Sequence, residues 1–151
     1  MIKNLSINTD AKFTLQKRLI HSLVNQVKEE LNISINYLLI NFINSSYIRS
    51  LNKKYLEHDY TTDIITFNYS GENDNLDGEI FISYADAKEN SRKYKVTLGN
   101  EIIRLVVHGI LHLAGYDDET PGDKKKMKKL EDELVKKYGK SAKKLVLKYD
   151  W

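Results

Sequence analysis

Two histidines and an aspartate in the second half of the chain have the types and spacing of a metal site. His108 and His112 are four residues apart, so on a helix they share one face, with their Cβ atoms roughly 5–6 Å apart. Gly115 follows, where a glycine can leave a helix through a left-handed backbone conformation. The turn would bring Asp118 back toward the imidazoles, with Asp117 as the alternative carboxylate. Three protein ligands and a fourth position for water are the arrangement of a catalytic zinc. The sequence therefore predicts one Zn²⁺ per chain, with His108, His112 and Asp118 as its ligands and as the catalytic residues.

The helix around the histidines is the element that must position them. From Ile102 to Leu113 the only polar side chains are Arg104, His108 and His112, which predicts a buried central helix. The alternative to a metal is a pair of core histidines that make hydrogen bonds. Burying two imidazoles is costly without partners, and a metal ion would hold both.

A zinc with three protein ligands predicts hydrolysis, because it lowers the pKa of its bound water from 15.7 to about 7 and polarises a carbonyl or phosphoryl oxygen. Metalloproteases of the metzincin kind share the spacing of these ligands, but they place a glutamate directly after the first histidine as general base. That position is Gly109 here. General-base assistance is worth ~10²–10⁴ in rate, so a metalloprotease is the weaker alternative.

Hydrophobic periodicity and capping residues predict an α+β fold in one domain over residues 1–151. The polar segment 70–77 would join two strands as a hairpin. Thr14, Ser83 and Thr120 are the expected N-caps of three of the helices. We expect His21 on the surface and His58 in a solvated loop, with Tyr116 serving in packing. The expected strands cover residues 2–7, 33–43, 62–69 and 78–84, and the expected helices cover 14–32, 47–55, 83–94, 99–113 and 120–139.

Composition and charge limit the kinds of metal ligand, cellular location and binding partner that the sequence allows. The 151 residues include no cysteine, so a metal site must use nitrogen and oxygen ligands. The first residues lack the apolar core of a signal peptide, and no apolar run reaches the length of a membrane span, which favours a soluble cytoplasmic protein. Residues 123–144 carry ten lysines and a net charge of +6, against +3 for the whole chain. This lysine face suits RNA, although a solvated helix face without a partner is the alternative.

Three sequence blocks resemble one known family. The central run His108-Gly109-x-Leu111-His112-Leu113-x-Gly115-Tyr116-Asp117 is similar to the signature of the YbeY family, bacterial endoribonucleases of rRNA maturation. Upstream, Leu51-Asn52-x-x-Tyr55 with Thr62-Asp63-Ile64-Ile65-Thr66-Phe67, and then Gly78-Glu79-Ile80-Phe81-Ile82-Ser83, are similar to two further family segments in the same order. The resemblance runs from about residue 51 to residue 119.

The resemblance implies a zinc-dependent endoribonuclease that prefers single-stranded RNA and acts on precursor small-subunit rRNA and in ribosome quality control. It further implies the ribosome as partner, no membrane and no DNA, and a mixed sheet of four strands packed by about five helices, with the metal in a basic cleft.

Two positions depart from the family pattern. Asp118 stands where the third ligand is usually histidine, and Leu56 stands where many members carry an arginine thought to face the cleft, a role that Lys53 or Lys54 could take. Leu56 keeps open a non-catalytic rRNA-binding assembly factor. Asp63 could support the metal ligands or merely begin a strand.

Overall fold

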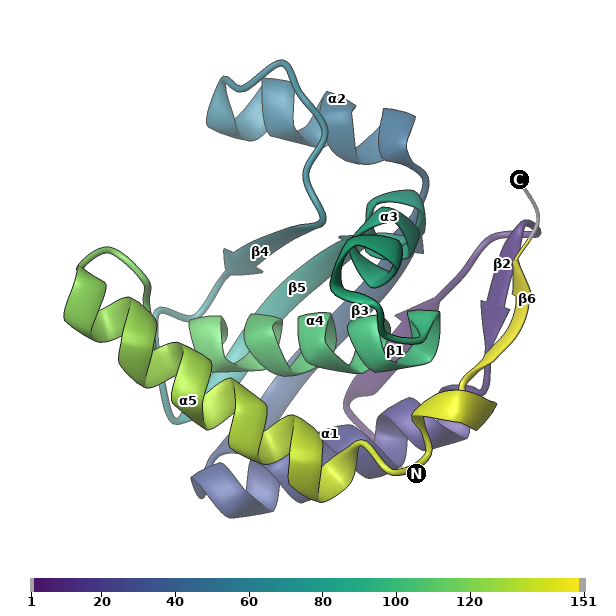
Figure 1. Cartoon of the computed structure of the whole chain (residues 1–151). Helices are drawn as coiled ribbons and strands as arrows, with labels where there is room; N and C mark the ends of the chain where they lie inside the picture. Colours follow the sequence, from purple (N-terminus) through teal and green to yellow (C-terminus); the bar gives the residue numbers. More distant parts are fainter. Residues whose placement is uncertain (1, 150–151) are drawn as a thin grey trace.

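A mixed four-stranded sheet forms the centre of the computed structural model, which describes residues 2–149 (Figure 1). Its strands, in spatial order, are β1 (Leu5–Asn8), β3 (Ser34–Ile43), β5 (Asn75–Ser83) and β4 (Ile64–Asn68). The first three are parallel neighbours, and β4 pairs antiparallel with β5. The predicted mixed sheet and the predicted hairpin are therefore confirmed.

Within residues 2–149, five α-helices surround this sheet, as the sequence predicts. The central one is α4 (Leu98–Leu113), which runs across one face of the sheet (Figure 1) and buries eleven of its residues. Among the described residues, no single helix has the length and apolarity to cross a membrane; α3 and α4 meet that test only together, as a pair bent by 113°. The helices are α1 (Lys17–Leu31), α2 (Ser45–Leu56), α3 (Tyr84–Tyr94), α4 (Leu98–Leu113) and α5 (Pro121–Tyr138).

The two faces of the sheet bury different helices. Successive strand residues point to opposite faces, so Ile80 and Ile82 of β5 join the main core with α4. Phe81 lies between them in sequence and packs on the other face, with Ile48 of α2 and Ile65 of β4. The α4 helix is thus held against the face opposite α2.

A second, two-stranded sheet was not predicted. Strand β2 (Phe13–Leu15) pairs antiparallel with β6 (Val146–Tyr149), which follows a short 3-10 helix over Ala142–Lys144. Thr14 therefore lies in a strand, and α1 begins at Lys17 rather than after a Thr14 cap. Tertiary packing explains the difference, because Phe13 is fully buried and stacks on the Tyr84 ring with centroids 5.1 Å apart.

The position predicted for His21 is also wrong. Its side chain is buried, with 6% of the residue exposed, and its Nδ1 accepts a hydrogen bond from the backbone N–H of Ile2 at 3.2 Å. The chain segment before β1 packs over this helix face, which the periodicity of α1 alone does not reveal. His58 is exposed and Tyr116 packs against the core, as predicted.

Candidate metal and catalytic site

The turn after α4 has the geometry that the glycine predicted. Gly115 has a φ of 97°, in the left-handed region. Its N–H donates to the His112 carbonyl and the Tyr116 N–H donates to the Leu111 carbonyl, so the last helical carbonyls are satisfied. The chain then reaches Thr120, whose hydroxyl accepts from the Asp123 N–H and caps α5. The predicted helix end and the predicted cap are both confirmed.

The structure places His108 close to each of the other two predicted ligands, although His112 does not line the cavity that His108 shares with Asp118. The His108 and His112 rings have centroids 6.4 Å apart and planes inclined by 44°. Asp118 lines a cavity of about 480 Å³ together with His108, whereas Asp117 lines a different one. Of the two carboxylates, Asp118 is therefore the one that accompanies His108.

The histidines are more exposed than a buried helix implied. The His108 side chain is 27% exposed and His112 is exposed, because their face of α4 turns away from the sheet. Within residues 2–149, no three histidine, aspartate or glutamate side chains lie close enough together to hold a metal ion. His108 thus lies near both other candidate ligands, but the three side chains do not form a metal-binding group in the described part of the chain.

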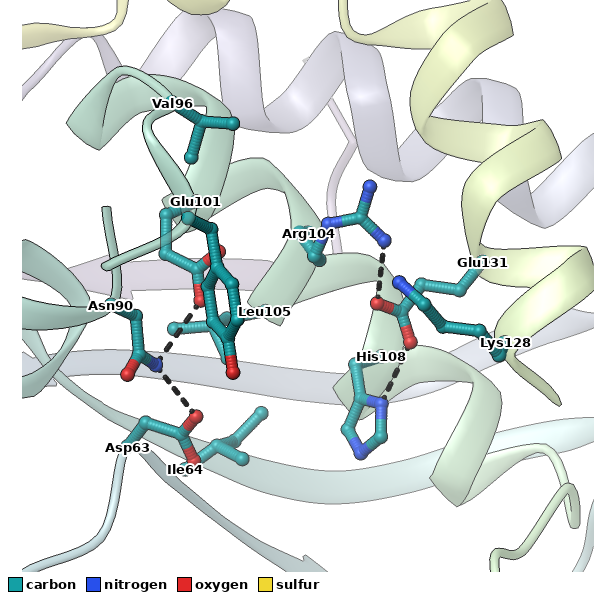
Figure 2. A pocket seen from close by; sticks show the side chains of 11 residues that line it. Asp63, Ile64, Asn90, Val96, Glu101, Arg104, Leu105, His108, Lys128 and Glu131 are labelled. Carbon is teal, nitrogen blue, oxygen red and sulfur yellow. Dashed lines mark hydrogen bonds and ion pairs between the residues drawn. The ribbon is translucent and has the colours of Figure 1, made fainter. Parts of the chain in front are cut away.

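Glu131 of α5 is the partner of His108, and sequence reasoning missed it. Its Oε2 lies 3.0 Å from His108 Nδ1, and its Oε1 accepts from Arg104 Nη1 at 2.9 Å (Figure 2). Glu131 is buried at a position of α5 between the buried residues Met127 and Leu134. An acidic residue within an apolar stripe was the signal that could have found it.

The contact between these two side chains shifts both pKa values. The hydrogen bond that His108 donates to Glu131 raises the pKa of His108, against the opposing effect of burial. Burial opposes ionisation of Glu131, but hydrogen bonds from His108 and Arg104 outweigh it and lower the pKa of this carboxyl. An ionised carboxylate only accepts, so His108 Nδ1 carries the proton. In the neutral ring, Nε2 then presents its lone pair.

This arrangement fits zinc chemically. Two imidazoles and one carboxylate are ordinary zinc donors, and a histidine ligand almost always donates its other ring N–H to a carboxylate, carbonyl or water. Figure 2 shows the second ring nitrogen of His108 directed away from Glu131. Binding would require His112 and Asp118 to close on the ion that this nitrogen contacts.

Part of the lysine face adjoins this region. Lys124, Lys125 and Lys128 line the same cavity as His108 and Asp118. Lys128 also pairs with Asp132 at 3.1 Å, and Lys137, farther along α5, pairs with Glu30. The first two turns of α5 therefore place cations beside the candidate ligands.

Glu131 also lines a second cavity, of about 520 Å³ (Figure 2). Asp63 lies directly before β4 and accepts from Asn90 Nδ2 at 3.0 Å, and the same amide nitrogen donates to Glu101 at 3.3 Å. Burial raises the pKa of both carboxyl groups. His108, Lys128 and Glu131 line both cavities.

Packing explains the glycine after the first histidine. A Cβ on Gly109 would lie 2.8 Å from Ile80 Cδ1 and 3.2 Å from Ile64 Cδ1. This face of α4 packs on the sheet, so the glutamate of a metzincin protease would have to displace the ends of these two isoleucine side chains. Leu56, at the end of α2, is 46% exposed and shares neither cavity with His108.

Known proteins of one family are similar to this chain over most of its length. The sequence model of the family described as endoribonuclease YbeY matches residues 2–139. The endoribonuclease YbeY of Chlorobium limicola is 33% identical over 134 residues, which cover 89% of this chain and 92% of that protein. The one of Cytophaga hutchinsonii is 36% identical and covers 82% and 87%. The solution structure of TM1509 from Thermotoga maritima is similar with a TM-score of 0.59 and 28% identity, over 89% of this chain and 91% of that one.

Proposed function

The chain belongs to the YbeY family of endoribonucleases, and from that premise we propose a zinc-dependent enzyme that cleaves single-stranded RNA. Family membership makes it a hydrolase that acts on RNA. Its proposed substrate is precursor small-subunit rRNA on the cytoplasmic ribosome, and its proposed roles are rRNA maturation and ribosome quality control. The carrying observation is that Glu131 holds His108 Nδ1 beside a cavity that Asp118 and three lysines also line.

Each group in this region has a task in that proposal. His108, His112 and Asp118 would hold the ion, which when bound polarises a phosphoryl oxygen and lowers the pKa of a bound water. Glu131 fixes the ring of His108 in one tautomer. The ammonium groups of Lys124 and Lys125 would contact the RNA phosphates. The carboxylate of Asp118 leaves the ion less electrophilic than a third imidazole would.

Metal removal tests the proposal directly. We expect the purified protein to cleave a labelled single-stranded RNA, to lose cleavage after chelation, and to regain it when zinc is restored. Elemental analysis should give about one zinc per chain. Cleavage that persists in protein shown to be free of metal would contradict zinc dependence.

The lysines beside His108 should bind RNA phosphates. Replacing Lys124, Lys125 and Lys128 together by glutamine should weaken single-stranded RNA binding and flatten its salt dependence, by ~0.7 in the log–log slope for each phosphate that the variant no longer neutralises. The matched control replaces Lys140, Lys143 and Lys144, which belong to the same basic stretch but do not line this cavity. Equal slopes in both triple variants would assign the first three lysines to solubility.

A non-catalytic rRNA-binding factor is the second candidate, and Leu56 is the observation that favours it. If the enzyme lacks one cation that would stabilise the transition state, Leu56→Arg should raise the cleavage rate by about tenfold. A well-aligned donor raises such rates by ~10², and an introduced arginine would give less because it lacks supporting contacts. Leu147→Arg, at another exposed leucine, controls for added charge. Tight rRNA binding with no cleavage in any variant would favour the binding factor.

A further inference from the structure

The cavity of Figure 2 has two chemically different ends. In the view, Asp63, Asn90 and Glu101 gather on one side, and Arg104, Lys128, Glu131 and His108 on the other. Its volume of about 520 Å³ lies within the range of small-molecule sites. The end that holds Arg104 and Lys128, which pair with Glu131 and Asp132, is also the end that carries the candidate metal ligand His108.

The end around Asn90 presents hydrogen-bond acceptors. Asn90 directs its amide nitrogen to Asp63 and Glu101, so its carbonyl oxygen is the group it has left to offer. A carboxylate has about four acceptor positions, and the bond from Asn90 uses one of those of Asp63. Burial raises the pKa of both carboxyl groups, which indicates partial desolvation, and hydrogen bonds made there are stronger than in water.

The walls between the two ends suit a planar ring. Ile64, Val96 and Leu105 supply apolar surface, and Tyr94 supplies an aromatic ring that also lines the cavity while 61% of the residue is exposed. Unpaired RNA bases stack on such aromatic side chains. Lys128 lines the other end, where its exposed ammonium group pairs with Asp132 at 3.1 Å, and it is the cation that a phosphate of the same nucleotide would meet.

We propose that this cavity is a subsite for a guanine base of the RNA, read by Asp63 and stacked on Tyr94, with its phosphate directed toward Lys128 and His108. The inference rests on the proposed ribonuclease function and adds a base preference to it. Guanine carries two neighbouring N–H donors, which one carboxylate accepts together. Adenine and cytosine offer one amino group and uracil one imino group, so they satisfy fewer of the acceptors.

Binding of mononucleotides tests the subsite without any cleavage. In NMR titrations we expect GMP to bind at least about tenfold more tightly than AMP, CMP or UMP, since one bidentate pair discriminates by roughly that factor or more. Its shifts should map to residues around Asn90. Asp63→Asn keeps the size of the side chain but replaces one acceptor by a donor, so it should abolish the preference for GMP while leaving UMP binding unchanged.

A second variant keeps the test independent of any folding defect at Asp63. Tyr94→Ala removes an exposed ring and should weaken the binding of all four nucleotides by about tenfold. Tyr60→Ala, at an exposed tyrosine outside the cavity, should leave their binding unchanged.

Wild-type protein that binds GMP no more tightly than UMP, or a Tyr94→Ala variant that binds like wild type, would overturn the subsite. GMP binding with no RNA cleavage would leave the subsite standing and the ribonuclease proposal refuted. Cleavage with no dependence on guanine would refute the subsite alone.

Discussion

Replacing His112 by alanine is expected to reduce bound zinc from about one per chain to near zero and to abolish RNA cleavage. Loss of a supporting residue alone costs 10–100-fold in metal affinity, so loss of a ligand should cost at least about 100-fold. His112 is the informative position because its side chain is exposed, and its replacement should leave the stability of the fold nearly unchanged. Elemental analysis and a labelled single-stranded RNA measure the two effects.

The control is His58→Ala, which removes an exposed loop imidazole that lies outside the candidate site. It should retain both zinc and cleavage. Equal zinc in the His112 and His58 variants would remove His112 from the ligand set. A contaminating nuclease would be indicated if the His112 and His58 variants cleaved the RNA equally, and no faster than a mock preparation that lacks the protein.

Replacing Glu131 by alanine should weaken zinc binding by 10–100-fold, because His108 would lose the acceptor that fixes its tautomer and orientation. Glu131→Gln keeps an acceptor oxygen and should lose less. Competition with a chromophoric chelator measures the affinity. In metal-free protein, the pKa of His108 should fall in both variants, because the hydrogen bond that His108 donates to Glu131 is what raises it. ¹⁵N NMR of the ring follows this titration.

Asp132→Asn is the matched control for Glu131. Asp132 is the next residue of α5 and also accepts from Arg104, at 2.7 Å, but it makes no hydrogen bond to His108. If Asp132→Asn weakened zinc as much as Glu131→Gln, the effect would be one of local charge and not of the bond to His108. A metal-free wild type in which His108 Nδ1 is unprotonated would also contradict the role of Glu131.

Local signals predicted most of the fold. Ser83 and Thr120 cap their helices as expected, accepting from the N–H groups of Asp86 and Asp123, and Gly115 ends α4 as expected. These features depend on residues within a few positions of one another, so a single sequence contains their physical cause. The five helices and the four strands of the main sheet follow from the same short-range patterns.

The features that sequence missed depend on distant contacts. Strand β2 has three residues and pairs with the far end of the chain, so no local pattern distinguishes it from the start of a helix. The bond between Glu131 and His108 joins residues 23 positions apart. Asn90 of α3 donates both to Asp63, in the loop before β4, and to Glu101 of α4. The spacing of the candidate ligands could be predicted from the sequence, whereas the residues that surround them could be identified only from the three-dimensional structure.

The contact of Gly109 with the sheet also bears on how such sites can evolve. A glutamate at this position would place its Cβ 2.8 Å from Ile80 Cδ1 and 3.2 Å from Ile64 Cδ1, so side chains of β4 and β5 would have to move to admit it. The general base that metzincin proteases carry after the first histidine therefore conflicts with the way this helix packs on its sheet. A change toward peptide hydrolysis would need rearranged core side chains as well as the new carboxylate. Core packing thus helps to keep apart two hydrolase types that share the spacing of their ligands.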